Sequence, residues 1–513
     1  MANILLQKCC TNFGTAFFFE KIHIMRYLIL LTYWTLPMFV FGQTIANSQT
    51  FPTNKPAFSL LELAKRARSE GKIQDAFVQL DAVIQLDANN CEAYSERALV
   101  QVALNESWQA LNDFGRAAEL CPNEPFIYVE RGNLLYQLNR FDDALRDFDA
   151  AIDLSPNIAK AFYLRGQCFS AVKKYDAALV AYNKAIQLDS SYAMIFNNRG
   201  VVKSLLGDME GAIGDYDKGI VLDSAKIILY QNRARANLQL SKFGTAIKGF
   251  NEAIRLSPNE AELYCQRAIL KRIFGDYEGS LIDINDALRL SDSENASYFL
   301  QRGLTYYHWR KMNLSLQDLN KTILIDAHLA EAFYYKGLYF KYLNQQDSAV
   351  VYFAECIKND NKHIGAYSAR GDIYYRSGKF EAAALDYSQI LLSYPDDDVA
   401  YMGRANAYRN LGKYKNAIDD YTEAIRFNST NDQAFHGRAM SKFQSGSFRT
   451  AILDFGKAID LMPQKETYFN RAFAKLAFGD KDGACEDFHQ AAQMGLYKAN
   501  SEAIVKLCEA KSK

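Results

Sequence analysis

The repeat unit that decides the fold is the segment YVERGNLLYQLNRFDDALRDFDAAIDLSP, residues 128–156. Apolar residues recur in it at i, i+3, i+4 and i+7 in two successive stretches, with a turn at Asn139 between them. We therefore expect a helix, a short turn and a second helix, which Pro156 ends because proline cannot continue a helix. Gly132 and Ala144 stand where the two helix backbones must approach closely, since larger side chains there would push the helices apart.

The same pattern recurs along the chain with a period of 34 residues. In thirteen successive units a Gly or Ala is followed twelve residues later by an Ala or Ser, with one step of 35 residues and one of 33. A fixed period of this size predicts an all-α solenoid of stacked helical pairs. The first small residues are Ala64, Ala98, Gly132, Gly166, Gly200, Ala234, Ala268, Gly303, Gly337, Gly371, Ala405, Ala439 and Ala472. The second small residues are Ala76, Ala110, Ala144, Ala178, Ala212, Ala246, Ser280, Ser315, Ala349, Ala383, Ala417, Ala451 and Ala484.

This pattern resembles the tetratricopeptide repeat, from about Phe58 to Met494. The resemblance implies a right-handed superhelix of helix-turn-helix units with a C-terminal capping helix. The first unit departs most from the family pattern, with Leu60 for the opening aromatic residue and Val83 for the late alanine, as expected of an end unit. In the second unit the family's residues are Tyr94, Ala98, Ala110, Phe114, Ala117 and Pro122.

Thirteen units and their caps occupy almost all of the chain after Phe58. We expect units 1–7 in residues 58–290, units 8–13 in residues 291–494, and a capping helix with the tail in residues 495–513. The 35-residue step lies at Ser291–Asn295, where we expect the superhelical pitch to change and two arms to meet. No segment of domain size is left for a catalytic domain.

An arginine precedes the first small residue in eleven units, and nine of these units carry an aspartate sixteen residues later. The ninth unit has Lys336 and Tyr352 instead, and the first has Leu63 and Gln79, so the two positions change together. We interpret them as a ladder of Arg–Asp pairs between the two helices of each unit, because a guanidinium fits a carboxylate. A basic stripe for an anionic ligand is the alternative. The nine pairs are Arg97–Asp113, Arg131–Asp147, Arg199–Asp215, Arg267–Asp283, Arg302–Asp318, Arg370–Asp386, Arg404–Asp420, Arg438–Asp454 and Arg471–Asp487.

The segment before the repeats predicts export. A basic start at Met25–Arg26 precedes fifteen mostly apolar residues and then a polar stretch, as in a secretory signal peptide. A membrane-spanning helix needs about 20 apolar residues, so this run is short for an anchor, although a retained N-terminal membrane anchor is the alternative. The expected segments are an upstream mis-start in residues 1–24, a signal peptide in residues 25–42 and a polar linker in residues 43–57.

Four of the nine cysteines form two candidate disulfides. Cys485 and Cys508 lie in the last repeat and in the expected capping helix, and Cys91 and Cys121 lie at the two ends of one antiparallel unit. The oxidising compartment of an exported protein permits such bonds. Buried free cysteines are the alternative at both places.

Charge and motifs argue against catalysis and against nucleic-acid binding. Lysine plus arginine equal aspartate plus glutamate at 59 each, so the chain has no basic excess. It contains no phosphate-binding glycine loop, nucleophile elbow or HExxH, and none of its six histidines has another His or Cys at helical ligand spacing. We expect no enzymatic activity, no cofactor, no metal site, no nucleic-acid partner and no small-molecule substrate.

The family resemblance implies that the first helices line a concave groove, into which the residue two before the first small residue points. Four consecutive units carry an amide there: Asn198, Asn232, Gln266 and Gln301. This row resembles the asparagine ladder with which the O-GlcNAc transferase superhelix holds peptide backbone, because a carboxamide both donates and accepts hydrogen bonds. A merely polar groove lining is the alternative.

Neighbouring groove positions are rich in tyrosine and basic residues, which interaction surfaces favour. Packing of the tyrosines between first helices is the alternative. The carboxylate clamp of chaperone-tail-binding members is not expected, because the position three before the small residue carries no Lys or Arg. The candidate binding residues here are Tyr307, His308, Tyr334, Tyr335, Lys341, Tyr342, Tyr375, Arg376 and Arg409.

Together these features predict an exported, non-enzymatic scaffold, periplasmic or otherwise associated with the envelope of a Gram-negative bacterium. We expect its concave groove to hold a protein or an extended peptide. The alternative is an assembly or regulatory subunit that docks on an envelope complex through its convex face or its ends.

Overall fold

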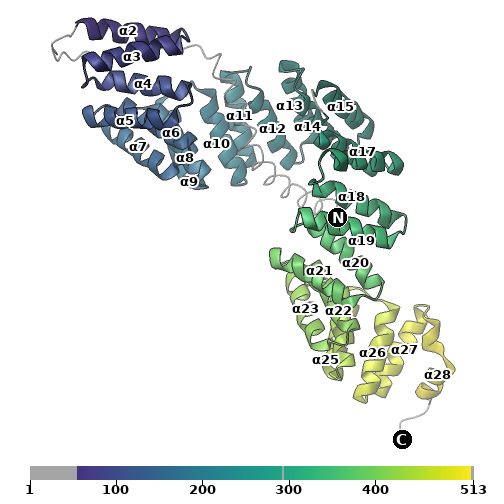
Figure 1. The fold of residues 1–513 in the computed structure, drawn as a ribbon. Coiled ribbons are helices and arrows are strands. Elements are labelled where there is room, and N and C mark those ends of the chain that lie inside the picture. Colours follow the sequence, from purple (N-terminus) through teal and green to yellow (C-terminus); the bar gives the residue numbers. More distant parts are fainter. Residues whose placement is uncertain (1–54, 292–293, 510–513) are drawn as a thin grey trace. The chain divides into compact units, whose positions relative to one another are not determined.

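The computed structural model describes residues 55–291 and 294–509. Within these ranges the fold is all-α, with 27 α-helices, one 3-10 helix and no strand (Figure 1). The α-helices α2 to α27 form thirteen consecutive helix-turn-helix pairs, which confirms the predicted fold class and repeat architecture. The predicted right-handed twist of the superhelix stays a prediction.

Each pair consists of a first and a second helix of 13 to 15 residues, as the repeat period requires. The first helices are α2 (Lys55–Ser69), α4 (Cys91–Ala103), α6 (Pro125–Gln137), α8 (Ala159–Ala171), α10 (Ala193–Leu205), α12 (Ile227–Gln239), α14 (Ala261–Phe274), α16 (Ala296–His308), α18 (Ala330–Tyr342), α20 (Ile364–Arg376), α22 (Asp398–Asn410), α24 (Asp432–Gln444) and α26 (Lys465–Phe478). The second helices are α3 (Ile73–Leu86), α5 (Ser107–Leu120), α7 (Phe141–Leu154), α9 (Tyr175–Leu188), α11 (Met209–Leu222), α13 (Phe243–Leu256), α15 (Tyr277–Leu290), α17 (Met312–Ile325), α19 (Gln346–Asn359), α21 (Phe380–Ser393), α23 (Tyr414–Phe427), α25 (Phe448–Leu461) and α27 (Lys481–Gln493).

A residue with positive φ ends the first helix in every one of the thirteen pairs. Seven of these residues are glycines with φ between 71° and 95°, as the sequence predicts for a left-handed helix end. The other six are not glycine, yet they adopt φ between 58° and 63°. Three of the six are asparagines, which tolerate this region better than other side chains do. The repeat geometry therefore requires a positive φ at this position, and glycine adopts it with less strain than other residues.

The small residues allow the two helices of a pair to pack closely. A Cβ atom built on Gly132 would lie 2.8 Å from the ring of Phe148, and one built on Gly200 would lie 2.7 Å from the ring of Tyr216. Real Cβ atoms do not approach a ring so closely, so glycine at these positions is a packing requirement. The aromatic side chains that fill this space are almost completely buried.

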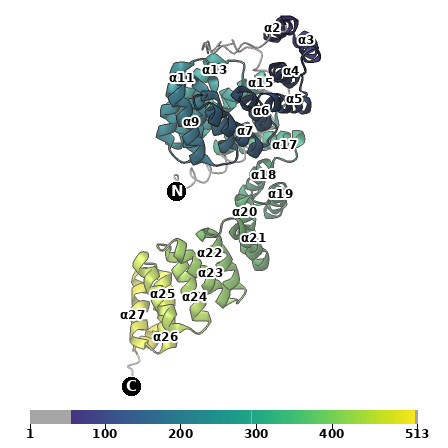
Figure 2. The same ribbon diagram turned by 90° about the vertical axis from the view of Figure 1, so that its left-hand side faces the viewer.

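The described residues form two compact units, which divide between Leu263 and Tyr264 within α14. In each unit consecutive helices lie side by side, as α4 to α9 and α22 to α27 do in Figures 1 and 2. The division falls earlier in the sequence than the joint expected at residues 291–295. The first helix begins at Lys55, so residues 55–57 belong to α2 and not to the polar linker.

The C-terminal cap consists of a 3-10 helix η1 (Tyr497–Asn500) and helix α28 (Glu502–Glu509), where the sequence predicted one continuous helix. Ile504 and Leu507 of α28 pack against the last repeat, so α28 covers apolar side chains at the end of the stack. The expected mis-start, signal peptide and linker up to residue 54 lie outside the described residues. None of the described helices has the length and apolar character needed to cross a membrane.

Candidate functional site

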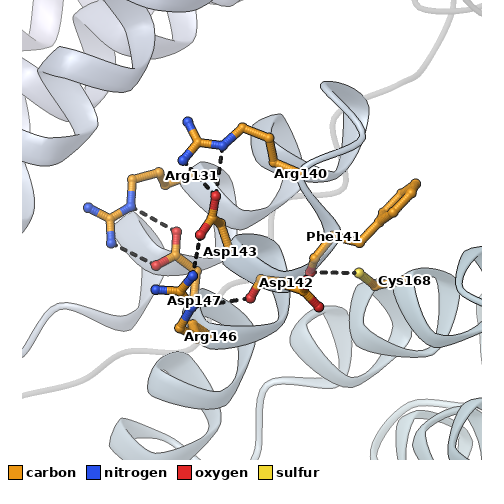
Figure 3. Close-up of polar contacts among 8 residues, drawn as sticks. All are labelled: Arg131, Arg140, Phe141, Asp142, Asp143, Arg146, Asp147 and Cys168. Carbon is orange, nitrogen blue, oxygen red and sulfur yellow. Dashed lines mark hydrogen bonds and ion pairs between the residues drawn. The ribbon is translucent and has the colours of Figure 1, made fainter.

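Nine Arg–Asp pairs join the first and second helices, as the sixteen-residue spacing predicts. In each pair the arginine Nε donates to aspartate Oδ2 and Nη2 donates to Oδ1, with distances of 2.5–2.9 Å. Figure 3 shows this fork at Arg131 and Asp147. All nine aspartates are buried, with 1–7% of their surface exposed. Parallel hydrogen bonds of this kind fix geometry as well as charge.

Four lysines that the Arg–Asp spacing does not predict join the ladder. Each stands four residues after a ladder arginine, on the same face of the first helix, and its Nζ lies 2.7–3.0 Å from the Oδ2 of the same aspartate. A lysine four residues after a ladder arginine is the sequence feature from which these contacts could have been predicted. They are Lys203, Lys271, Lys442 and Lys475.

Four units have an altered ladder, and in three of them the basic residue makes another contact. Arg165 and Arg233 have no aspartate sixteen residues later, and they turn back to Asp149 at 2.9 Å and Asp217 at 2.7 Å on the preceding second helix. Lys336 lies 4.4 Å from the ring centroid of Tyr352, a cation–π contact in place of an ion pair. The ladder is therefore an internal framework, and its arginines are not a stripe open to an anionic ligand.

The first helices line the inner side of each compact unit. In one unit α4 contacts α6 and α6 contacts α8, and in the other α20 contacts α22 and α22 contacts α24. In the described part of the chain, neighbouring second helices make no contacts of that extent. Side chains of the first helices that point away from the second helices therefore face the inner side.

Two of the predicted amides belong to a chain of hydrogen bonds across α12, α10 and α8. Arg235 Nη1 donates to Asn232 Oδ1 at 3.3 Å, and Asn232 Nδ2 donates to Asn197 Oδ1 at 2.9 Å. Asn197 Nδ2 donates to Asn198 Oδ1 at 3.0 Å, and Asn198 Nδ2 donates to the Tyr163 hydroxyl at 3.0 Å. Of these residues, the repeat position predicted only Asn198 and Asn232.

The hydrogen-bond chain orients both amides but leaves part of their capacity free. A carboxamide has two N–H groups and two oxygen lone pairs, so Asn198 and Asn232 each keep one donor and one acceptor beyond these contacts. Both side chains are half-buried, whereas Asn197 is buried. Burial also raises the pKa of Tyr163, which keeps its hydroxyl protonated as a hydrogen-bond partner.

The other two predicted amides lie in the second compact unit. Gln301 is buried, and its Oε1 accepts a hydrogen bond from Arg272 Nη2 at 3.0 Å, whereas Gln266 on α14 is half-buried. Gln301 is therefore occupied within the fold. The four predicted amides are thus divided between the two units. The two in the first unit are oriented by the hydrogen-bond chain, and the other two lie in the second unit.

Tyrosines of the second unit pack against one another between first helices. The ring centroids of Tyr307 and Tyr335 are 5.0 Å apart, those of Tyr334 and Tyr335 are 5.3 Å apart, and those of Tyr334 and His363 are 4.6 Å apart. These tyrosines form the packed arrangement that was the alternative to a binding surface. Tyr342 at the end of α18 is different, because 63% of its surface is exposed.

The remaining predicted residues form a polar surface on α18, α20 and α22. Lys341 Nζ lies 3.7 Å from Asp372 Oδ2, and Asn410 Nδ2 donates to the Tyr375 hydroxyl at 3.0 Å. Arg376 is exposed and Arg409 is half-buried. Within residues 55–291 and 294–509 neither arginine makes a hydrogen bond or an ion pair.

Both candidate cysteine pairs are joined in the structure. Cys91, the first residue of α4, is bonded to Cys121, which follows α5, and their Cα atoms are 6.0 Å apart. Cys485 of α27 is bonded to Cys508 of α28, with a Cα separation of 5.6 Å. The second bond ties the capping helix to the last repeat. The other cysteines of the described ranges form no disulfide and are buried: Cys168, Cys265 and Cys356.

A hollow of about 460 Å³ lies between α11, α12 and α13, beside Arg233. Asp217, Lys248 and Glu252 also line the hollow. In the sequence, Gly249 occupies the ladder-aspartate position of this unit. The charges of both signs leave the hollow without a clear ligand preference. The described residues hold no group of three or more His, Cys, Asp or Glu side chains arranged to bind a metal ion.

Two family models described as tetratricopeptide repeat match the sequence, over residues 129–193 and 399–431. The matched segments fall in different compact units and share the helix-turn-helix pattern of the other pairs. These two segments are therefore tetratricopeptide repeats. No curated protein matches the sequence.

Several solved structures resemble the chain at low sequence identity. The structure of the APC/C hetero-tetramer Cut9–Hcn1 is 14% identical, with a TM-score of 0.36 over 88% of this chain and 96% of that one. The TPR domain of P58(IPK) is 20% identical, with a TM-score of 0.31 over 76% of this chain and 98% of that one. A tetratricopeptide repeat protein from Parabacteroides merdae is 20% identical, with a TM-score of 0.34 over 49% and 98%.

Proposed function

We propose that this protein is a non-catalytic scaffold that binds a protein or an extended peptide along the inner side of its first helices. Tetratricopeptide repeats generally bind protein or peptide partners, which supports the scaffold class. The observation that carries the proposal is the set of inner-side groups with free hydrogen-bonding capacity. Asn198 and Asn232 in one unit, and Tyr342, Arg376 and Arg409 in the other, are such groups.

The hydrogen-bond chain of α8, α10 and α12 favours an extended peptide over a small molecule. Its amides are held in fixed orientations by their neighbours, so binding would cost little side-chain entropy. A free N–H and a free lone pair on each amide can satisfy the C=O and N–H groups of a peptide backbone. Such contacts do not depend on the side chains of the peptide.

We propose that the protein works outside the cytoplasm, in the cell envelope. The signal-peptide pattern of residues 25–42 supports export. The two disulfides are also the kind of bond that oxidising compartments allow and the cytosol opposes.

The alternative is a subunit that docks through its outer side, and it has its own supporting observation. Exposed leucine and valine side chains stand at one repeat position on the second helices, including Val351 on α19, Leu385 on α21 and Leu453 on α25. Exposed apolar groups of this kind also occur singly on ordinary surfaces, so they favour the alternative only weakly.

Site-specific photocrosslinking separates the two proposals. A photoreactive phenylalanine analogue is placed at Tyr342, on the inner side, or at Leu385, on the outer side, two positions with matched exposure of 63% and 65%. After irradiation of cells, the inner-side scaffold predicts a partner adduct from position 342 and none from position 385. Adducts from position 385 alone would support docking through the outer side.

A further inference from the structure

Most arginines of the described ranges have an acidic or amide partner, and two of those that do not lie on neighbouring first helices. In the described ranges, four arginine side chains have neither a hydrogen bond nor an ion pair: Arg310, Arg376, Arg409 and Arg449. Arg376 ends first helix α20 and Arg409 lies in first helix α22, whereas Arg449 lies on second helix α25. Arg409 is also half-buried.

An unpaired guanidinium in a half-buried position is unfavourable unless an anion completes it, because burial removes part of its hydration. Burial lowers the pKa of His436, and the charge of Arg409 lowers it further. The neighbouring groups are neutral hydrogen-bonding groups: the Tyr375 hydroxyl with Asn410, and Asn406 with the Tyr421 hydroxyl. None of them neutralises the arginine.

The cations follow the repeat. Lys341, Tyr375 and Arg409 each stand four residues after the first small residue of their unit, on α18, α20 and α22, and Arg376 directly follows Tyr375. Three successive first helices therefore each carry one cation at this position or directly after it. The nearby carboxylate of Asp372 lies 3.7 Å from Lys341, so the surface is not uniformly basic.

We propose that the surface of Lys341, Tyr375, Arg376 and Arg409 binds an extended acidic peptide that carries a carboxylate at every third residue. This inference rests on the proposed function and names the chemistry of the partner. Carboxylates fit guanidinium groups through two parallel hydrogen bonds, and the Tyr375 hydroxyl and the Asn410 amide offer partners for the peptide backbone.

The spacing of the first helices sets the spacing of the acidic residues. Packed helices lie about 8–10 Å apart. A polyproline-II chain advances about 3.1 Å per residue with three residues per turn, so side chains three residues apart point the same way about 9 Å apart. Acidic residues at i, i+3 and i+6 therefore match Lys341, Arg376 and Arg409. A nucleic acid fits less well, because its denser phosphates would meet the carboxylate of Asp372.

The test uses the purified full chain and a fluorescein-labelled Ser/Pro peptide of about ten residues with glutamate at i, i+3 and i+6. Fluorescence anisotropy at low salt measures its affinity. We expect the Arg376→Gln/Arg409→Gln variant to bind at least about tenfold more weakly than wild type, because two carboxylates lose their partners. Arg449→Gln removes the same kind of charge from an outer helix and should bind like wild type. Arg376→Lys/Arg409→Lys, which keeps both charges, should retain most of the affinity.

Three results would overturn the inference: equal binding by the Arg376→Gln/Arg409→Gln variant, equal binding of a peptide with glutamine at the same positions, or tighter binding of a single-stranded oligonucleotide. Binding of a peptide with three adjacent glutamates as tight as that of the spaced peptide would refute the spacing. If the acidic peptides fail while the crosslink from position 342 persists, the scaffold stands and only its acidic partner is excluded. If that crosslink is also absent, the proposed function itself fails.

Discussion

Arg131 and Asp147 are joined by two parallel hydrogen bonds, from Nε to Oδ2 at 2.8 Å and from Nη2 to Oδ1 at 2.7 Å, which tie α6 to α7 (Figure 3). The same two bonds recur in eight further pairs of the described chain. Hydrogen bonding to Asp147 raises the pKa of Arg131 above its already high ordinary value, so the guanidinium stays charged. The ladder fixes how the two helices of a unit face each other.

Removing one partner of this pair should destabilise the fold. We expect Arg131→Met to cost about 2–3 kcal/mol, because the buried Asp147 carboxylate loses both partners. Hydrogen exchange of α6 and α7 and the thermal midpoint measure the loss. Arg146→Met is the matched control, since the Arg146 side chain is 77% exposed in its ion pair with Asp143 and should matter little. Equal losses in the two variants would contradict a structural ladder.

Two glycines of one helix pair should respond oppositely to alanine. Gly200→Ala would place a Cβ atom 2.7 Å from the Tyr216 ring, and overpacking of this kind costs about 1–3 kcal/mol. A Cβ atom added to Gly214 on α11 would meet nothing within 4 Å, so Gly214→Ala should stabilise the helix by about 0.5–1 kcal/mol. Thermal unfolding of both variants tests this, and a shift of the same sign in both would refute the packing account.

Reduction should release the C-terminal cap. Cys485 and Cys508 close a loop of 23 residues, for which a disulfide is worth about 3 kcal/mol. We expect Cys508→Ser to accelerate hydrogen exchange in α28 and at the end of α27, and to leave the other repeats unchanged. Dithiothreitol should reproduce this effect in wild type but add nothing at the cap of the variant. An unchanged cap after reduction would show that packing alone holds α28.

His436 should make stability depend on pH. Its Nδ1 lies 3.0 Å from Thr467 Oγ1 and its Nε2 lies 3.3 Å from Asn470 Nδ2, and burial lowers its pKa below the ordinary 6.5. Below pH 6.5 the unfolded chain therefore takes up a proton that the folded chain resists. Stability should fall as the pH drops, by at most about 1.4 kcal/mol per pH unit from this group.

Urea unfolding of wild type and His436→Gln between about pH 7.5 and pH 5 tests this expectation, with the pH window set by the ordinary histidine pKa of about 6.5. The variant should lose part of the pH dependence, and His489→Gln, an exposed histidine on α27, should keep it. A variant with the slope of wild type would rule out His436 as the source.

Most of the fold could be predicted from the repeat period, because each unit packs its two helices in the same way. The positions of Gly132 and Phe148, or of Arg131 and Asp147, could be predicted since local helix geometry and one fixed spacing determine them. Arg165 and Arg233 were different. Each pairs with an aspartate in the preceding unit, and no spacing within one unit contains that information.

The candidate site was harder to predict, because it depends on contacts between units. Asn198 and Asn232 were found from their position in the repeat, but their partner Asn197 stands one position earlier, where the sequence offered no reason to expect a bond. In the sequence, nothing distinguished Tyr334 and Tyr335 from the exposed Tyr342. Only the packing of neighbouring first helices separates packed tyrosines from exposed ones.

The most direct test of inner-side binding is affinity capture from the native envelope fraction after crosslinking. Wild type is compared with Asn198→Ala/Asn232→Ala, and with Gln109→Ala/Asn112→Ala, which removes two exposed amides from second helix α5. Each variant is first shown to keep the helical content and thermal midpoint of wild type. Inner-side binding predicts that a partner captured by wild type is retained by the α5 variant and lost by Asn198→Ala/Asn232→Ala. Retention by Asn198→Ala/Asn232→Ala together with loss from the α5 variant would contradict it.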